Sequence, residues 1–166
     1  MFTSIKELVA QAEGTTIGEI MLRREAEHSS REQALADMQE SLNVMRAAVH
    51  KGMEGVTSHS GMTGGNAQKM HQYLQSGHAL TGDTFLRSIT YALATNEVNA
   101  AMGVICASPT AGSCGVLPGV LLAAQEHMQC SDEDVVLALF CAGAIGLVVA
   151  NNAMISGAAG GCQAEV

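Results

Sequence analysis

Apolar residues recur at helical spacing along most of this chain. One such series comprises Leu35, Met38, Leu42, Met45 and Val49. Residues three and four positions apart share one face of an α-helix, so the series predicts a helix that buries this face. Gly52 and Gly55 follow the series and predict where the helix ends, because glycine commonly terminates helices.

Hydroxyl-bearing residues mark the starts of the predicted helices. Ser4, Thr16 and Ser30 each have Glu or Gln three residues later, which is the spacing of a capping box. Further helices are predicted over residues 68–75, 83–102 and 113–128, and an apolar helix from Ser131 through Val149. Acidic residues in the first turn of this last helix suit the positive end of its dipole. Because no strand-like alternation interrupts these patterns, the chain is predicted to be all-α.

Three polar segments that contain glycine separate the predicted helices. They are the first loop, "TSHSGMTGGN" (57–66), the second loop, "SPTAGSCG" (108–115), and the third loop, "NNAMISGAAGGC" (151–162). Each carries Ser, Thr or Asn and precedes a helix start, where exposed backbone N–H groups can hold a small anion such as a carboxylate. Any one of them is more often an ordinary turn. Three in an otherwise apolar domain point to a shared site.

Composition and charge favour close-packed helices. Hydrophobic residues make up 48% of the chain but aromatic residues only 3%, and small side chains suit a helical bundle better than a sheet. The net charge of −8 argues against a nucleic-acid partner. No Lys or Arg follows Arg87. We therefore expect one domain, with a charged helical region (1–55) and apolar helices with three polar loops (56–166), covered by a partner or further chain.

Cysteine usage and hydropathy indicate the compartment. The chain has five cysteines, an odd number, and no signal peptide at its start, which predicts a cytoplasmic location. The apolar run at residues 135–150 is about 16 residues long, short of the roughly 20 that span a membrane, and it lacks Lys or Arg on either side. We therefore expect a buried helix and no membrane partner.

The cysteines do not form a paired motif. No two of them have the C-x-x-C spacing typical of zinc or ferredoxin sites. Cys141 is predicted to be a core residue and Cys130 to be structural or exposed, whereas Cys106 and Cys114 flank the second loop and are weak ligand candidates. Cys162 differs, because the glycines of the third loop free the backbone around it. Spacing alone leaves a ligand role and a structural role both open.

Two ionisable residues are further candidates. His59, in the first loop, is either a general base or a simple loop histidine. Glu97, within "ATNEVNAAMG", is the one ionised group in the apolar part (88–102) of a predicted helix. Either Asn96 and Asn99 satisfy a structural carboxylate, or the three side chains face a polar ligand.

Four segments in this order resemble one known family. They are "SGMTGGNA", "ATNEVNAAMG", "SPTAGSCG" and "NNAMISGAAGGCQAEV". Together they resemble the alpha chain of the iron–sulfur-dependent bacterial L-serine dehydratases, and the opening run "SIKELVAQAE" followed by "IGEIML" is similar to the start of that family. The resemblance extends over essentially the whole chain.

The resemblance implies an enzyme and a cofactor. The family's alpha part is an all-helical catalytic domain that works with a beta chain or domain and deaminates L-serine to pyruvate and ammonia, in serine catabolism and gluconeogenesis, without pyridoxal phosphate. Its 4Fe–4S cluster is held by three cysteines, one of which lies in a G-C-Q-x-E-V motif that Cys162 matches. The other two belong to motifs resembling C-D-P-V-A-G and V-P-C, expected beyond residue 166. A homo- or hetero-oligomer is expected.

The resemblance also implies which loop residues orient the substrate. The predicted substrate-binding residues are Ser60, Gly61, Thr63, Gly64, Thr110, Ala111, Asn151 and Ser156. The cluster would act as a Lewis acid on serine, and no residue is assigned as the general base. The chain is then expected to be active only with the C-terminal remainder and a beta partner. The alternatives are an inactive remnant that acts as a helical partner-binding module and a cytosolic zinc- or anion-binding helical module, which a lone cysteine disfavours.

Overall fold

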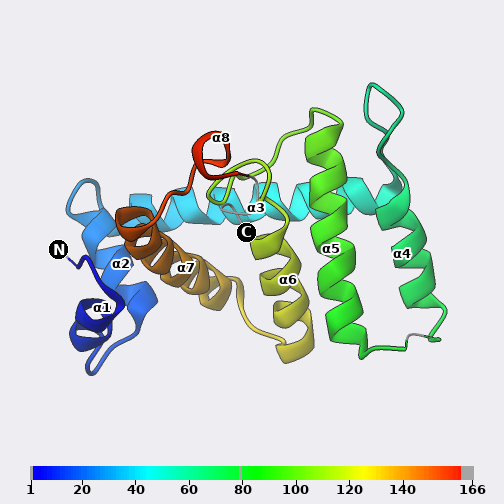
Figure 1. Ribbon diagram of the computed structural model, residues 1–166. Helices are drawn as coiled ribbons and strands as arrows, with labels where there is room; N and C mark the ends of the chain where they lie inside the picture. Colours follow the sequence, from blue (N-terminus) through cyan, green and yellow to red (C-terminus); the bar gives the residue numbers. More distant parts are fainter. Residues whose placement is uncertain (1, 79, 162–166) are drawn as a thin grey trace. The chain divides into compact units, whose positions relative to one another are not determined.

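The computed structural model describes residues 2–78 and 80–161. Across these residues the chain is helical and has no β-strand (Figure 1). The helices are α1 (Ile5–Gln11), α2 (Ile17–Ala26), α3 (Arg31–Glu54), α4 (Asn66–Gln75), α5 (Asp83–Ala100), α6 (Val116–Met128), α7 (Asp132–Asn152) and α8 (Gly157–Gly160). An isolated antiparallel bridge joins Thr57 and Gly64. The all-α prediction is confirmed.

The helix starts predicted at Ser4, Thr16 and Ser30 are confirmed, although none of the three has a complete capping box. The hydroxyls of Ser4, Thr16 and Ser30 each accept a hydrogen bond from the backbone N–H three residues later, at 3.1–3.3 Å. The carboxylate of Glu19, however, binds the Arg31 guanidinium in a bidentate pair at 2.7 and 3.0 Å. Ser131 and Asp134 form the full reciprocal box at the start of α7. The side chain that would close the capping box at Thr16 is therefore bound to Arg31 instead.

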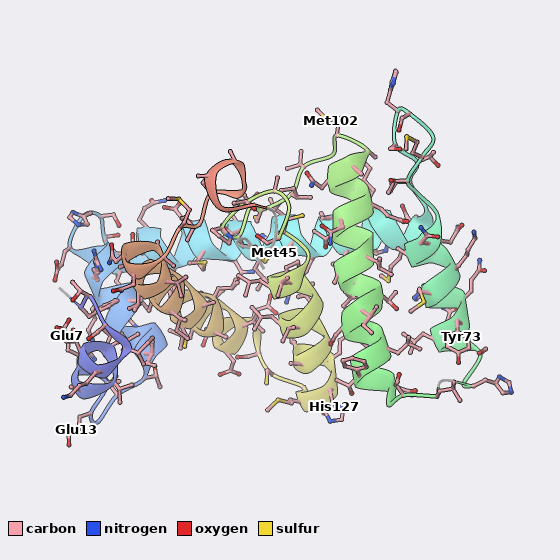
Figure 2. All side chains as sticks on the ribbon, viewed as in Figure 1. Glu7, Glu13, Met45, Tyr73, Met102 and His127 are labelled. Carbon is pink, nitrogen blue, oxygen red and sulfur yellow. The ribbon has the colours of Figure 1, made fainter. Side chains whose placement is uncertain are left out.

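The end of α5 differs from the predicted position for an identifiable reason. Residue Met102 has φ 61° and stops α5 at Ala100, two residues before the predicted end. The N–H groups of Met102 and Gly103 donate to the carbonyls of Asn99 and Val98 at 3.0 and 2.8 Å, which is the Schellman arrangement. The side chain of Met102 is exposed beyond the end of the helix (Figure 2). Because this position is Met and not the glycine that usually ends a helix, the sequence does not indicate that α5 ends here.

The chain divides into two compact units, and α3 contributes to both. In residues 2–41 and 131–161, α2 packs against α7, and α1 contacts both helices. A Cβ on Gly18 of α2 would lie 2.3 Å from the carbonyl oxygen of Leu137, so the two backbones approach closely only because this residue is glycine. A small buried cluster in this unit comprises Phe2, Leu8, Ala144 and Val148.

The second unit, residues 42–78 and 80–130, is built around α5. Figure 1 shows α5 between α4 and α6, and it packs against both. A Cβ on Gly119 of α6 would lie 2.7 Å from the carbonyl oxygen of Ser88, and one on Gly52 of α3 would lie 2.3 Å from that of Ala94. The core thus depends on small residues at helix crossings, as the low aromatic content predicts. The predicted single domain with a boundary near residue 55 stays a prediction.

The apolar helix α7 is longer than predicted. It extends to Asn152, whose side-chain amide donates to the carbonyls of Thr3 and Val148 at 2.8 Å each. Its 21 residues are long and apolar enough to cross a membrane by length and composition. The length of this helix therefore no longer argues against a membrane span. One face is buried, including Leu139 and Phe140, while Ile145 and Val149 are exposed. The prediction of a buried helix therefore holds for one face, and the lack of a membrane partner stays a prediction.

Candidate functional site

A buried carboxylate on α5 holds the start of α4. Glu97 is 3% exposed, and its Oε1 and Oε2 accept hydrogen bonds from the backbone N–H groups of Asn66 and Ala67 at 2.8 and 3.2 Å. The preceding residue, Gly65, has φ 75° and provides no side-chain cap. Glu97 therefore acts as the cap of α4 from a different helix, and its negative charge lies at the positive end of the α4 dipole.

This contact makes Glu97 a structural carboxylate, but the expectation that Asn96 and Asn99 satisfy it is wrong. Its carboxylate is satisfied by backbone N–H groups, whereas the side chains of Asn96 and Asn99 bind elsewhere. Two of the N–H groups at the start of α4, which the sequence offers to an external anion, are thus already bound to an internal carboxylate. Hydrogen bonds of this kind explain how a charge remains buried.

The first loop (57–66) is a tight turn held by its own hydrogen bonds. The N–H of Ser58 donates to the carbonyl of Thr63 at 2.7 Å, and the N–H of Thr63 donates to the hydroxyl of Ser58 at 3.1 Å. The Ser60 hydroxyl lies 3.2 Å from that of Ser58. Gly64 has φ 147°, and a Cβ there would lie 2.2 Å from the carbonyl oxygen of Val56, so this closure requires glycine. The loop is therefore preformed.

The tip of the first loop faces solvent. The predicted substrate-binding residues in it are Ser60, Gly61, Thr63 and Gly64, of which the first three are exposed and the last is half-buried. His59 is also exposed, and nothing in its surroundings marks it as a base. Exposed hydroxyl and backbone groups on a rigid turn are suited to bind a small polar molecule.

The second loop (108–115) is attached to the same helix. The amide of Asn99 donates to the carbonyl of Ala111 at 2.9 Å, and the thiol of Cys114 donates to the side-chain oxygen of Asn96 at 3.6 Å. A Cβ on Gly115 would lie 2.6 Å from the Asn96 side-chain nitrogen, so glycine allows the loop to reach α5. Asn96, Glu97 and Asn99 together hold both loops.

A buried hydroxyl organises the second loop internally. Ser113 is 2% exposed, and its Oγ donates to the carbonyl of Ser108 at 3.0 Å and lies 3.3 Å from the hydroxyl of Thr110. The sequence places Ser113 at the start of a helix, which is wrong, because α6 begins at Val116 after Gly115. The hydroxyl folds the loop instead of capping the helix. Among the described residues the buried Oγ of Ser108 has no hydrogen-bond partner.

The third loop (151–162) belongs to the other unit. Asn151 lies in the last turn of α7 and is exposed, and Ser156 precedes the short α8, is exposed and makes no capping bond with its side chain. Cys162 lies outside the described residues. The structure therefore attaches each of the first two loops to α5, and a site shared by all three loops stays a prediction.

The described cysteines do not by themselves fit an iron–sulfur cluster. In residues 2–78 and 80–161, no three His, Cys, Asp or Glu side chains lie close enough to hold a metal ion. Cys114 is buried, and burial raises the pKa of its thiol, which disfavours the thiolate that a metal requires. The other described cysteines, Cys106, Cys130 and Cys141, are half-buried. Cys162, the ligand that the family resemblance implies, lies outside these residues, and its role stays a prediction.

The geometry defines a class of protein: a helical scaffold that presents two preformed polar loops from one helix. Comparison with known families identifies which scaffold it is. The family "Serine dehydratase alpha chain" matches residues 12–166, and the chain belongs to this family. No solved structure matches it.

Curated relatives match nearly the whole chain. It is 51% identical over 170 residues to the probable L-serine dehydratase, alpha chain of Bacillus subtilis, covering 100% of this chain and 57% of the relative. It is 33% identical over 171 residues to the L-serine dehydratase, alpha chain of Peptoniphilus asaccharolyticus, covering 99% and 58%. With L-serine dehydratase 1 of Escherichia coli the values are 32% over 174 residues, 99% and 38%. The chain thus spans less than two thirds of these relatives.

Proposed function

We propose that this chain is part of an L-serine ammonia-lyase that converts L-serine to pyruvate and ammonia. Family membership and relatives that carry the name L-serine dehydratase support the proposal. The structural observation that supports it best is the attachment of two polar loops to α5 through Asn96, Glu97 and Asn99. Such an arrangement keeps substrate-binding groups at fixed positions before the substrate arrives.

The reaction requires groups that bind a carboxylate, an amine and a hydroxyl. A base removes the Cα proton of serine, hydroxide leaves Cβ, and the resulting aminoacrylate tautomerises and is hydrolysed to pyruvate and ammonia. The exposed hydroxyls of Ser60 and Thr63 and the half-buried hydroxyl of Thr110 are the donors that we propose for orienting serine. Gly61, Gly64 and Ala111 would contribute backbone groups at the same loops. The base is not assigned.

We further propose that the enzyme uses a 4Fe–4S cluster and that Cys162 is one of its ligands. When bound, the cluster would supply a Lewis acid that makes hydroxide a feasible leaving group. Two further cysteine ligands are expected from sequence beyond residue 166. Asn151 and Ser156, which precede Cys162, would complete the substrate-binding groups from the third loop.

The partners follow from the same proposal. The designation "alpha chain" in the relatives implies a beta chain, and we propose that a beta chain or domain completes the site. We also propose that the whole enzyme is a homo- or hetero-oligomer. The expected location is cytoplasmic. Exposed apolar side chains in the second unit, including Phe85, Val104 and Val120 at 60%, 76% and 54% exposure, are suited to such a partner.

The test is serine turnover by a completed enzyme. Residues 1–166 would be joined to the remaining segment of the Bacillus subtilis alpha chain, combined with a beta chain and reconstituted anaerobically with iron and sulfide. We expect pyruvate to form from L-serine and not from D-serine, and chelation of iron before assembly to abolish it. A folded complex that contains iron and forms no pyruvate from L-serine would contradict the proposal.

A second candidate function is a non-catalytic helical module that binds a partner. The exposed apolar side chains of the second unit favour it. In the same experiment, this function predicts that the chain binds the beta chain in gel filtration, whereas the completed assembly forms no pyruvate.

A further inference from the structure

We propose that Glu97 is a positioning residue that sets the place of the first loop relative to the second by holding the start of α4 against α5. This inference rests on the proposed function, because it assigns Glu97 a role in orienting the substrate of that site. It goes beyond the structural and ligand-binding hypotheses that the sequence offers for this residue. Glu97 itself touches backbone and not substrate.

The two loops are rigid within themselves. The first loop is closed by hydrogen bonds between Ser58 and Thr63, and the second by those of Ser113 with Ser108. Motion within either loop would break these bonds. The relative position of the loops therefore depends on what attaches each of them to the rest of the unit.

These attachments converge on one turn of α5. Glu97 holds the N–H groups of Asn66, the last residue of the first loop, and of Ala67, which follows it. Asn99 holds the second loop at the carbonyl of Ala111. Because positions 97 and 99 are fixed to each other by the helix backbone, each loop is held relative to the other through α5.

Glu97 is well suited to this role by its charge and burial. Hydrogen bonds to a carboxylate are roughly twice as strong as those between neutral groups, and low exposure protects them from water. At the other end of the loop, the side chain of Gln68 donates to the carbonyl of Glu54 at 2.8 Å, but this contact is exposed and neutral. Loss of the Glu97 carboxylate would therefore loosen the first loop more than loss of Gln68.

The substitution Glu97→Gln tests the role with little change in shape. The amide keeps one acceptor oxygen, but its NH₂ group faces an N–H donor, so one of the two amides of Asn66 and Ala67 loses its partner. Hydrogen exchange of the 166-residue chain should show that these two amides exchange about tenfold faster, as expected for one lost hydrogen bond. Glu97→Ala should raise the exchange further, because both amides lose their acceptor.

A matched control is Glu126→Gln in the same unit. Glu126 accepts hydrogen bonds from Tyr91 and Arg87 at 2.6 and 2.7 Å and has no contact with either loop. The same change of carboxylate to amide there should leave the exchange of Asn66 and Ala67 as in the unchanged chain. Glu126 is exposed, unlike Glu97, so this control separates loss of the α4 cap from loss of a hydrogen-bonded carboxylate elsewhere in the unit.

In the completed enzyme, Glu97→Gln should raise KM for L-serine about tenfold and lower kcat by a smaller factor, because the loop groups are misplaced before binding. Glu126→Gln should leave both constants unchanged. Unchanged exchange at Asn66 and Ala67 in Glu97→Gln, or equal changes of KM in the two variants, would overturn the proposal. If the unsubstituted enzyme forms no pyruvate, the proposed function fails, but the exchange measurement still tests whether Glu97 holds the loop.

Discussion

The crossing of α5 and α6 gives the sharpest stability prediction, the effect of Gly119→Ala. A Cβ at position 119 would lie 2.7 Å from the carbonyl oxygen of Ser88, 2.9 Å from the Cβ of Ala92 and 3.1 Å from its backbone nitrogen. Two of these three atoms are backbone, so no change of side-chain rotamer relieves the contact. The helices would have to move apart by several tenths of an ångström, which would loosen the helix that carries both loops.

The expected magnitude is a balance of two effects. Alanine is favoured over glycine in a helix by about 1 kcal/mol, while overpacking a close-packed contact costs about 1–3 kcal/mol. Gly119→Ala should therefore lower the free energy of unfolding by about 1 kcal/mol. In the control Gly146→Ala on α7, the new Cβ meets nothing within 4 Å. This variant should gain about 0.5–1 kcal/mol from helix propensity alone.

The assay is urea unfolding of the three chains followed by circular dichroism. We expect the midpoints to fall in the order Gly146→Ala, unchanged chain, Gly119→Ala, with about 2 kcal/mol between the two variants. If Gly119→Ala equalled or exceeded Gly146→Ala in stability, the two helices would not approach as closely as described. The inference that small residues set the helix crossings would then be wrong.

Two further predictions concern the helix ends. The hydroxyl and backbone N–H of Ser131 hold the pKa of Asp134 below its ordinary value of 3.8, so this cap stabilises the chain above pH 3.8 and the effect is lost as the pH falls through the lowered pKa. Asp134→Asn should therefore lower the thermal midpoint at neutral pH and not in strong acid, and equal differences at both pH values would contradict the assignment. Met102→Gly should raise the free energy of unfolding by about 0.5–1 kcal/mol in urea titration, because glycine adopts the left-handed region of φ 61° without strain; a loss of stability would show that the exposed side chain makes contacts that matter more.

Helical periodicity and hydroxyl caps predicted most of the fold because both depend on residues close in sequence. The caps at Ser4, Thr16 and Ser30 each bind a backbone N–H three residues away. The helix ends were harder to predict. Met102 ends α5 by adopting a conformation that its side chain does not favour, and the backbone bonds that compensate are visible only in the folded chain.

The candidate site was only partly predictable because its main contacts are distant in sequence and involve backbone groups. The sequence marked Glu97 as unusual, but its partners lie 31 and 30 residues away and are the N–H groups of Asn66 and Ala67, which any residue type can offer. The bond from Asn99 to the carbonyl of Ala111 is of the same kind. Ser113 was misassigned because a serine before an apolar run is typical of a helix cap.

The assignment of Cys162 as a cluster ligand is the central claim, and it is tested most directly by iron binding and turnover in the same preparation. The completed enzyme and its Cys162→Ala variant would be reconstituted anaerobically in parallel and assayed for bound iron, visible absorption and pyruvate from L-serine. We predict that the unchanged enzyme gains the iron–sulfur absorption and forms pyruvate, whereas the variant folds with the same helical content and loses both. A Cys162→Ala enzyme that keeps its iron and turns over L-serine at the unchanged rate would contradict the account.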